Sequence, residues 1–251
     1  MRKNVAVIIL AAGMGTRMKS DKAKVLHEIQ GRAMILYVVE TARKIAGDDV
    51  IVVIGHQGEE VRAIVSDSAE LLFAYQEHQL GTGHAVRCAL PKIPEHCDHV
   101  IILCGDVPLI QPETIAALVK DHLEARRDVS LLAVEMDNPF GYGRILLDDN
   151  RQISAIIEEA DANAEQKLIK LINSGIYCID KAFLSEALPK IRADNAQGEL
   201  YLTDIMSIGY QEKRNMGVVV GTNCLQIIGI NTCQDLAAVD AVMKSHARII
   251  S

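Results

Sequence analysis

The sequence contains no tryptophan, and its aromatic residues amount to only 4% of the chain. Aromatic side chains form the stacking surfaces that bind single-stranded nucleic acid, so their scarcity argues against that function. The net charge of −7 argues against general binding to nucleic acids or anionic membranes. No apolar run approaches the ~18 residues of a membrane-spanning helix. We therefore expect no nucleic-acid partner and no membrane association.

Cysteine pairs are missing as well. Six cysteines occur, but they form no CxxC motif and no dense framework. This pattern is typical of reduced thiols in the cytoplasm. Met1–Lys3 followed by the apolar run Val5–Ala12 could imitate a signal peptide. That run is short for such a segment and begins a longer strand–helix pattern, so we expect a cytoplasmic protein.

Three familiar ligand motifs are incomplete or absent. Gly13–Met18 lacks the third glycine of the dinucleotide fingerprint, and no Gly-Lys pair occurs that could form a Walker A loop. His96–His99 carries ligand types for a transition metal, but no neighbouring group completes a zinc set. We interpret His96–His99 as a polar loop before a strand.

The periodicity of apolar residues predicts alternating strands and helices in the first half. The expected strands are Val5–Ala12, Asp49–Gly55, Leu71–Gln76 and Val100–Cys104. The expected helices are Met34–Ala46, Gly58–Val65, Thr82–Leu90 and one from Pro112 with a buried stripe of Ile115, Leu118, Val119 and Leu123. Such alternation favours a parallel sheet covered by helices on both faces.

The pattern becomes mixed after about residue 128. Strands are expected at Val129–Met136, Leu171–Ile179, Gly217–Thr222 and Ile227–Ile230, with a hairpin at Arg144–Leu147 and Gln152–Ile157. Helices are expected at Lys181–Ile191, Tyr201–Lys213 and Gln234–Ile249. We therefore interpret residues 1–128 and 129–251 as two halves of different character.

A glycine-containing loop with basic residues follows the first predicted strand. Gly13 and Gly15 allow backbone N–H groups to approach an anion closely. Arg17 and Lys24 add positive charge beside them. Taken alone, the loop could also be an ordinary glycine turn with solvated lysines. Gly105-Asp106 follows another predicted strand, and ligands bind at the carboxyl ends of parallel strands, so we expect one shared site for phosphates.

The segment Leu10–Met18, followed by Lys24-Val25-Leu26, resembles the signature of sugar-nucleotide pyrophosphorylases. Further segments resemble one subgroup, the bacterial N-acetylglucosamine-1-phosphate uridyltransferases. They are Gln76, Gln79–Ala85, Gly105–Leu109, Gly141–Ile145, Glu158, Ile172–Gly175, Asn195–Glu199 and Leu202–Ile205. These segments fall in the family's order and cover nearly the whole chain.

This resemblance implies an α/β, Rossmann-like nucleotidyltransferase fold with a mostly parallel sheet flanked by helices and a smaller mixed β acceptor-binding region. It implies a single nucleotidyltransferase domain over residues 1–251, with a nucleotide-binding half at 1–128. The sugar-phosphate-binding half and the C-terminal helix would then occupy residues 129–251. No hexapeptide repeat occurs, so we do not expect the acetyltransferase β-helix domain that often accompanies such enzymes. Without that domain, we expect a monomer or a weak oligomer.

The resemblance also implies roles for individual residues. Arg17 and Lys24 would be catalytic by neutralising phosphate charge, and Asp106 and Asn231 would bind Mg²⁺ as the cofactor. Gln76 would complement the carbonyl and N–H groups of uracil. The expected substrate-binding set is Leu10, Ala11, Ala12, Gly13, Gly15, Thr16, Gln76, Gly81, Thr82, Gly105, Asp106, Gly143, Glu158, Asn173 and Asn231, in which Gly143, Glu158 and Asn173 match the sugar positions.

The implied reaction converts UTP and N-acetylglucosamine 1-phosphate into UDP-N-acetylglucosamine and pyrophosphate. The nucleophile is a phosphate oxygen that is already anionic, so no general base is required. Two alternatives stay open at this point. One is uridylyl transfer to another sugar 1-phosphate, such as glucose or N-acetylgalactosamine 1-phosphate, and the other is a non-catalytic sugar-nucleotide-binding protein.

Three positions depart from the family pattern. Ala23 stands where proline commonly precedes the lysine, and Ala160 replaces a frequent lysine. Thr232-Cys233 follows Asn231, where a second polar residue and an arginine are common. None of these changes removes an expected ligand, but the last two bear on acceptor specificity.

Overall fold

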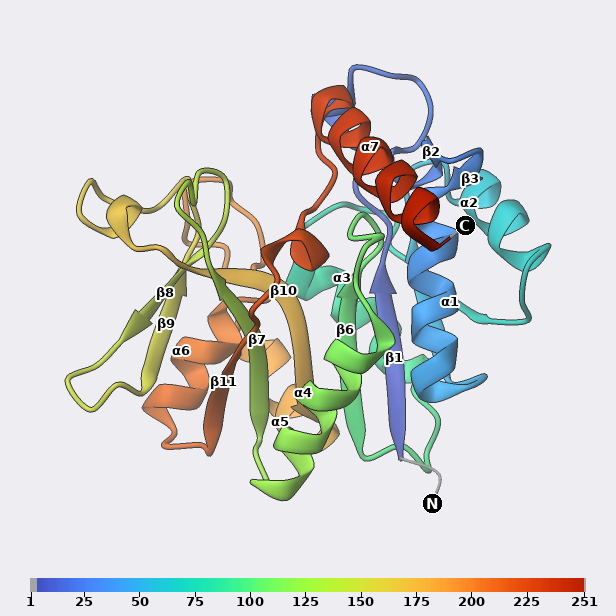
Figure 1. Cartoon of the computed structure of the whole chain (residues 1–251). Helices are drawn as coiled ribbons and strands as arrows, with labels where there is room; N and C mark the ends of the chain where they lie inside the picture. The colour runs from blue at the N-terminus through green and yellow to red at the C-terminus, as the bar shows by residue number, and fades with distance from the viewer. Residues whose placement is uncertain (1–3, 251) are drawn as a thin grey trace.

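The computed structural model describes residues 4–250, with side chains as far as residue 245. Over that range a nine-stranded sheet has the main order β11-β7-β10-β6-β1-β4-β5 (Figure 1). Its parallel part consists of β1 (Val5–Leu10), β4 (Val50–Ile54), β5 (Leu72–Tyr75) and β6 (His99–Cys104). The predicted parallel sheet is confirmed in this half of the chain.

The second half extends the same sheet with mixed pairing. It contributes β7 (Val129–Glu135), β8 (Arg144–Leu147), β9 (Ile153–Ile157), β10 (Leu171–Asp180) and β11 (Met216–Val220). Strand β10 lies antiparallel between β6 and β7, and β11 pairs with β7 in parallel. The β8–β9 hairpin joins β10 through the pair Arg144 and Ile172. The two halves therefore share one sheet.

Helices cover both faces of the sheet, as predicted. One face packs against α1 (Met34–Ala46), α2 (Gly58–Ser66) and α4 (Pro112–Glu124). The other packs against α3 (Thr82–Ala89), α5 (Lys181–Ala187) and α6 (Asp204–Gln211). Successive side chains of a strand point to opposite faces, so Val7 and Ile9 enter the first core while Ala6 and Ile8 enter the second.

The last helix, α7 (Cys233–Ile250), packs beside the short ribbon of β2 (Glu28–Ile29) and β3 (Arg32–Ala33). A small core of Ile29, Met34, Ile230 and Val239 joins them. Figure 1 shows α7 at the end of the molecule to which the parallel strands point. This helix therefore lies near the edge of the sheet where ligands of such folds bind.

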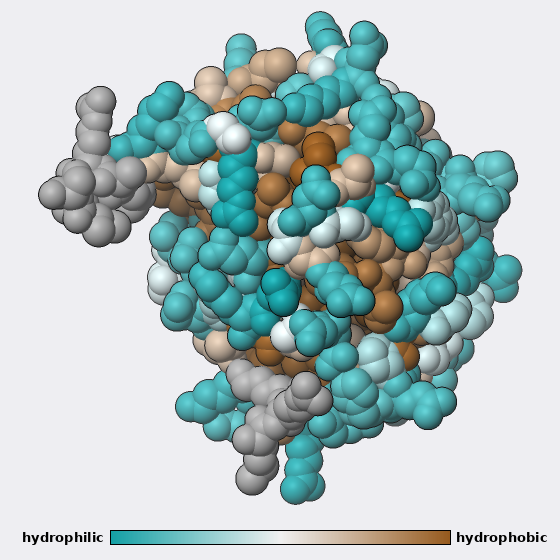
Figure 2. All heavy atoms as spheres, turned by 90° about the vertical axis from the view of Figure 1, so that its right-hand side faces the viewer, coloured by the Kyte–Doolittle hydropathy of each residue, from teal (hydrophilic) through white to brown (hydrophobic). Residues whose placement is uncertain are grey.

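On one side of the molecule, the surface is mostly hydrophilic. Figure 2 looks onto the right-hand side of Figure 1, and hydrophilic side chains cover most of that surface, with hydrophobic residues showing between them. None of the helices in the described part of the chain is long and apolar enough to span a membrane.

Two sequence predictions are wrong in detail. The expected strand Ile227–Ile230 is instead the end of a short 3₁₀ turn, Cys224–Ile227, followed by extended chain outside the sheet. Its apolar residues serve as anchors, since Ile227 and Ile230 are buried in two different cores.

The stripe predicted on the helix from Pro112 is also wrong at its end, because Leu123 is 38% exposed and His122 is fully buried in its place. Residues 115, 118, 119 and 122 follow the i, i+3, i+4, i+7 spacing of a helix face, which Leu123 leaves.

The predicted helices of the second half are shorter than expected. α5 ends at Ala187, and Leu188–Lys190 forms a 3₁₀ turn because Pro189 cannot continue the hydrogen-bond ladder. The helix expected at Tyr201–Lys213 begins at Asp204 and ends at Gln211. The hairpin turn forms as predicted, with Asp148 accepting from the backbone N–H groups of Asn150 and Gln152.

Candidate active site

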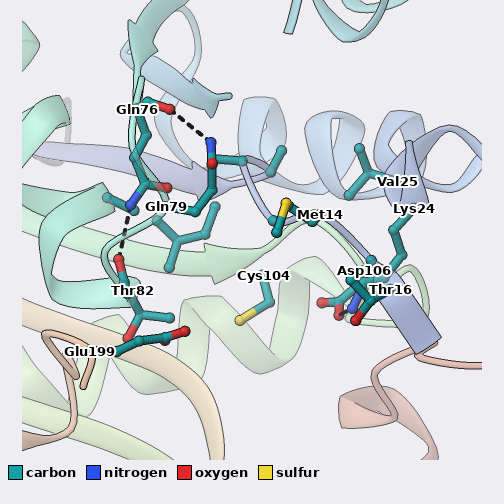
Figure 3. Close-up of a pocket in the computed structure, with 17 residues that line it drawn as sticks. Met14, Thr16, Lys24, Val25, Gln76, Gln79, Thr82, Cys104, Asp106 and Glu199 are labelled. Atoms are coloured by element: carbon teal, nitrogen blue, oxygen red, sulfur yellow. Dashed lines mark hydrogen bonds and ion pairs between the residues drawn. The ribbon is translucent and has the colours of Figure 1, made fainter. Parts of the chain in front are cut away.

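A cavity of about 400 Å³ opens at the carboxyl ends of β1 and β6. The expected site residues that line it are Leu10, Ala11, Ala12, Gly13, Gly15, Thr16, Lys24, Gln76, Gly81, Thr82 and Asp106. Figure 3 shows Gln76 and Gln79 at one end, Lys24, Thr16 and Asp106 at the other, and Met14 and Cys104 between them. The cavity therefore has an amide end and a charged end.

Gly15 determines how the first loop folds over the charged end. Its φ is +62°, and a Cβ added there would lie 2.6 Å from the Cβ of Lys24. Glycine is required because a side chain would meet both a steric clash and an unfavourable backbone conformation. The loop then closes in two 3₁₀ turns, Thr16–Met18 and Lys24–Leu26, so that Lys24 lies beside the glycines.

Four polar side chains converge at this end, and we call Arg17, Lys24, Asp106 and Asn231 the cation cluster. Lys24 Nζ donates to Asp106 Oδ2 and, at 2.9 Å, to Asn231 Oδ1. Arg17 Nη2 donates to the same Asn231 oxygen at 2.8 Å. Arg17 is exposed, whereas the side chains of Lys24 and Asp106 are each 18% exposed. Lys24 and Asp106 line the cavity, and Arg17 adds a second positive charge to the cluster through Asn231.

The start of α7 holds Asn231 in place. Thr232 Oγ1 accepts from the N–H of Asp235, and Asp235 Oδ2 accepts from the N–H groups of Asn231 and Thr232. This is a capping box, which fixes the chain entering the helix. In addition, Ile230 N donates to the Asp106 carbonyl at 2.9 Å. The threonine that departs from the family pattern therefore caps α7 and orients Asn231.

A loop from the second half closes the amide end. Gly83 N donates to Leu200 O at 2.7 Å, and Leu200 N donates to Leu80 O at 2.8 Å. At Gly81 the φ is +104°, and a Cβ would lie 2.6 Å from Leu200 O. Glu199, which precedes this contact, lines the cavity next to Thr82 (Figure 3). Two segments more than a hundred residues apart therefore form this wall together.

A second cluster lies on the mixed part of the sheet, and we call Gly143, Glu158, Asn173 and Thr203 the acceptor cluster. Asn173 N donates to Gly143 O at 2.9 Å, and Thr203 Oγ1 donates to Glu158 Oε1 at 3.1 Å. A Cβ on Gly143 would lie 2.9 Å from Ile156 and 3.4 Å from the Glu158 carboxylate. The glycine therefore leaves room beside that carboxylate.

The Asn173 side chain of the acceptor cluster is oriented by hydrogen bonds to residues of the same strand, β10. Asn173 Oδ1 accepts from Gly175 N at 2.9 Å and from the hydroxyl of the buried Tyr177 at 3.0 Å. The Asn173 amide nitrogen is consequently turned away from Tyr177, and no hydrogen bond from it to another described residue occurs. Burial raises the pKa of Glu158, with the hydrogen bond from Thr203 opposing the shift.

Cys104 connects the two clusters. It is the last residue of β6, lines the cavity and donates to Gly175 O. Its pKa is raised to about 12, mainly by burial and further by the carboxylates of Asp106 and Glu158. The thiol is therefore uncharged near neutral pH. It forms part of the cavity wall and does not act as a nucleophile.

The donor set of the cation cluster fits a magnesium ion. Asp106 Oδ2 and Asn231 Oδ1 both point at one cationic atom, Lys24 Nζ. A carboxylate and a carbonyl oxygen are the protein ligands that Mg²⁺ accepts beside phosphates and water. The oxygens are therefore already aimed at a shared positive charge.

Comparison with known proteins shows the family of this chain. Residues 7–173 match the family described as MobA-like NTP transferase domain. The chain belongs to this family.

Relatives named Bifunctional protein GlmU include one from Heliobacterium modesticaldum, 46% identical over 99% of this chain and 54% of its own length. Another, from Geotalea daltonii, is 42% identical over 96% of this chain and 52% of its own. The one from Desulfotalea psychrophila is 40% identical over 96% of this chain and 70% of its own. The chain thus spans about half the length of the first two relatives.

Solved structures agree on the fold. HddC from Yersinia pseudotuberculosis, complexed with GMP-PN, matches 95% of this chain and 99% of its own with a TM-score of 0.68 at 20% identity. A Bacillus anthracis protein provisionally assigned as a glucose-1-phosphate thymidylyltransferase matches 95% and 94% with a TM-score of 0.71 at 20% identity. The predicted fold class is confirmed, and the family match over residues 7–173 confirms the predicted membership of a nucleotidyltransferase family.

Sequence reasoning assigned no role to several residues of the site. Met14, Val25, Gln79, Ala85, Cys104 and Glu199 also line the cavity. Cys104 could have been found, because it ends the predicted strand that Gly105 follows. Glu199 belongs to the matching segment Asn195–Glu199, but its place in the cavity wall depends on the contact between Leu80 and Leu200 and could not be read from that segment.

The remaining departures have plain structural settings. Ala23 is buried and already has a proline-like φ of −52°, so Lys24 is placed without a proline. Ala160 lies in an exposed turn after Glu159, and Cys233 Sγ lies 3.6 Å from Met18 O. Of the His96–His99 stretch, His96 and Cys97 lie near Asp49 at the amino ends of the strands, away from the cavity.

Proposed function

We propose that this chain transfers a uridylyl group from UTP to N-acetylglucosamine 1-phosphate and releases pyrophosphate, with Mg²⁺ as its cofactor. The observation that carries the proposal is a cavity with an amide end and a charged end, next to which, across Cys104, lies the acceptor cluster. An amide end suits a base, the cation cluster suits a polyphosphate, and the acceptor cluster suits a sugar. A nucleoside triphosphate that spans the cavity would place its α-phosphate between the base and the cations.

The cation cluster would stabilise the departing pyrophosphate. An oxygen of the sugar phosphate attacks the α-phosphorus of UTP, and the bond from that phosphorus to the bridging oxygen of the β-phosphate breaks. Arg17 and Lys24 neutralise the negative charge that collects on the leaving group. Asp106 and Asn231 would hold the magnesium ion, which supplies further positive charge to the phosphates when bound. Positioning and charge therefore supply the catalysis, and no general base is needed.

The acceptor cluster supports an N-acetylated sugar. Asn173 offers amide N–H donors, because its oxygen is occupied by Gly175 and Tyr177. An acetamido carbonyl requires such a donor, whereas sugar hydroxyls can donate to the Glu158 carboxylate. Glucose 1-phosphate carries a shorter hydroxyl in place of the acetamido group, so the hydrogen bond from Asn173 to the acetamido carbonyl is lost, at a cost of about 1–3 kcal/mol.

Pyrophosphate release with each nucleoside triphosphate and a panel of sugar 1-phosphates tests the proposal. We expect UTP with N-acetylglucosamine 1-phosphate and a divalent cation to be the best pair. Faster pyrophosphate release with glucose 1-phosphate or N-acetylgalactosamine 1-phosphate would show that this sugar phosphate is the acceptor instead. No release with any pair, despite binding of UDP-sugars, would show a sugar-nucleotide-binding protein and not an enzyme.

A further inference from the structure

The side chain of Gln76 is held from two sides at the amide end of the cavity. Its Nε2 lies 3.0 Å from the carbonyl oxygen of Gly81 and 3.1 Å from Nδ1 of His84. Gln76 follows β5, Gly81 belongs to the following loop and His84 lies in the first turn of α3. Gln76 is only 3% exposed, yet it lines the cavity.

These two neighbours determine which way the amide faces. A carbonyl oxygen can only accept a hydrogen bond, so the atom of Gln76 that faces Gly81 must be the NH₂ group. The same NH₂ group faces His84 Nδ1, which must therefore be the unprotonated nitrogen of the ring. The proton of the neutral ring then lies on Nε2, which is 3.8 Å from the Cys88 sulfur. Burial lowers the pKa of His84, which favours this neutral ring.

The amide oxygen of Gln76 is left for a ligand. Among the described residues, no hydrogen bond to this oxygen occurs, although both hydrogens of the NH₂ group are directed at protein acceptors. This acceptor lines the cavity, so a ligand that displaces water from it must offer a donor in return. Uracil presents an N–H at ring position N3, whereas the corresponding nitrogen of cytosine is an acceptor and would face the Gln76 oxygen without a hydrogen.

We propose that His84 is a positioning residue for base recognition, which fixes the Gln76 amide with its oxygen toward the cavity and thereby selects uracil over cytosine. This inference rests on the proposed function, because it takes the amide end as the base site. His84 touches no substrate in this arrangement and acts through Gln76 alone.

The test compares His84→Ala, His84→Asn and wild type. Asn at this position carries a carbonyl oxygen near the place of Nδ1 and can accept from Gln76. We expect His84→Ala to lower the UTP-to-CTP ratio of kcat/KM about tenfold, mostly through KM for UTP, with KM for the sugar phosphate unchanged. We expect His84→Asn to restore most of the ratio. His56→Ala is the matched control, since His56 is an exposed histidine that is not part of the cavity wall.

Equilibrium binding of UMP and CMP, measured by calorimetry on the same proteins, separates this inference from the proposed reaction. Preferential UMP binding that His84→Ala abolishes supports the role of His84 even if no pyrophosphate is released. An unchanged preference in His84→Ala, or equal binding of UMP and CMP by wild type, would overturn it. Nitrogen NMR of the wild-type protein gives a readout that needs no variant, because a proton on His84 Nδ1 would also overturn the proposal.

Discussion

The cation cluster and the acceptor cluster are built in different ways. Three members of the cation cluster, Arg17, Lys24 and Asp106, lie on loops after the parallel strands β1 and β6, and Asn231 lies just before the start of α7. The acceptor cluster lies within the mixed sheet, where β8, β9 and β10 fix the backbone of Gly143, Glu158 and Asn173. Its polar atoms are oriented by buried partners such as Tyr177.

This difference indicates that the cation cluster binds its ligand through charge, whereas the acceptor cluster recognises its ligand through the arrangement of donors and acceptors. Phosphates carry several negative charges, so basic side chains on loops can bind them through charge-assisted hydrogen bonds. Sugars differ from one another by single groups, so discrimination requires donors and acceptors that are held rigidly. We therefore expect changes in the cation cluster to affect turnover with many substrates, and changes in the acceptor cluster to affect the choice of sugar.

The largest effect should come from Asp106→Ala. This variant removes the carboxylate that faces Lys24 and would hold the cofactor, and we expect kcat for pyrophosphate release to fall by roughly 10²–10³. Arg17→Ala should act in the same direction. The free energy of unfolding should change far less than turnover does, although the part-buried Lys24 ammonium loses its carboxylate partner in Asp106→Ala. Near-wild-type turnover in either variant would remove that residue from the mechanism.

Glu158→Gln should be next in size. We expect KM for the sugar phosphate to rise roughly 10–100-fold with KM for UTP unchanged, because a charged acceptor for sugar hydroxyls is lost. Equal changes in both KM values, from steady-state kinetics at fixed co-substrate, would contradict the separation of the clusters.

The raised pKa of Glu158 adds a dependence on pH. Its folded pKa lies above the ordinary value of 4.5, so the stability it contributes is complete below that value and is lost as pH rises through the folded pKa. Sugar binding requires the carboxylate and should weaken as pH falls through the same folded pKa. Wild-type KM for the sugar phosphate should thus rise on acidification, and Glu158→Gln should remove this rise.

Lys24→Met tests the cation cluster without turnover. The Lys24 ammonium occupies the oxygens of Asp106 and Asn231, so it should compete with a divalent cation. In the absence of nucleotide, we expect Mn²⁺, followed by its electron paramagnetic resonance, to bind about tenfold more tightly to the variant. Lys22→Met is the control, because Lys22 pairs with Glu28 instead. Weaker Mn²⁺ binding in Lys24→Met would show that these oxygens are not the cation site.

Tyr177→Phe should have a smaller effect, confined to the acceptor cluster. The variant removes one hydrogen bond to Asn173 Oδ1 and should lower the free energy of unfolding by about 1 kcal/mol, measured in urea. KM for the sugar phosphate should rise a few-fold while base selectivity stays constant. A shift in the UTP-to-CTP ratio would show that the clusters are coupled.

The smallest effect is expected for Ala23→Pro. Residue 23 already has a φ of −52°, and among the described hydrogen bonds none uses its N–H. The substitution should raise the free energy of unfolding by about 0.4–1 kcal/mol by restricting the unfolded chain. Destabilisation in a urea titration would mean that the buried site has no room for the ring.

Local sequence patterns predicted the individual strands and helices. They did not predict which strands pair when those strands are far apart in the chain. The apolar runs of β1, β4 and β6 and the glycine loop were visible because each depends on neighbouring residues. The position of β10 next to β6 was not visible, because it depends on pairing between distant residues such as Tyr177 with Ile102 and Asp180 with His99. The same limit applies to Glu199 and to the Gly143–Asn173 contact, whereas His122 could have been found from helical spacing alone.

Binding of UMP and UDP-N-acetylglucosamine to wild type, Gln76→Ala and Glu158→Gln tests the division of the site most directly. Calorimetry would measure all six affinities without turnover. We predict that Gln76→Ala weakens both ligands by the same factor, whereas Glu158→Gln weakens only the sugar nucleotide. Equal weakening of UMP and UDP-N-acetylglucosamine by Glu158→Gln would contradict separate base and sugar clusters.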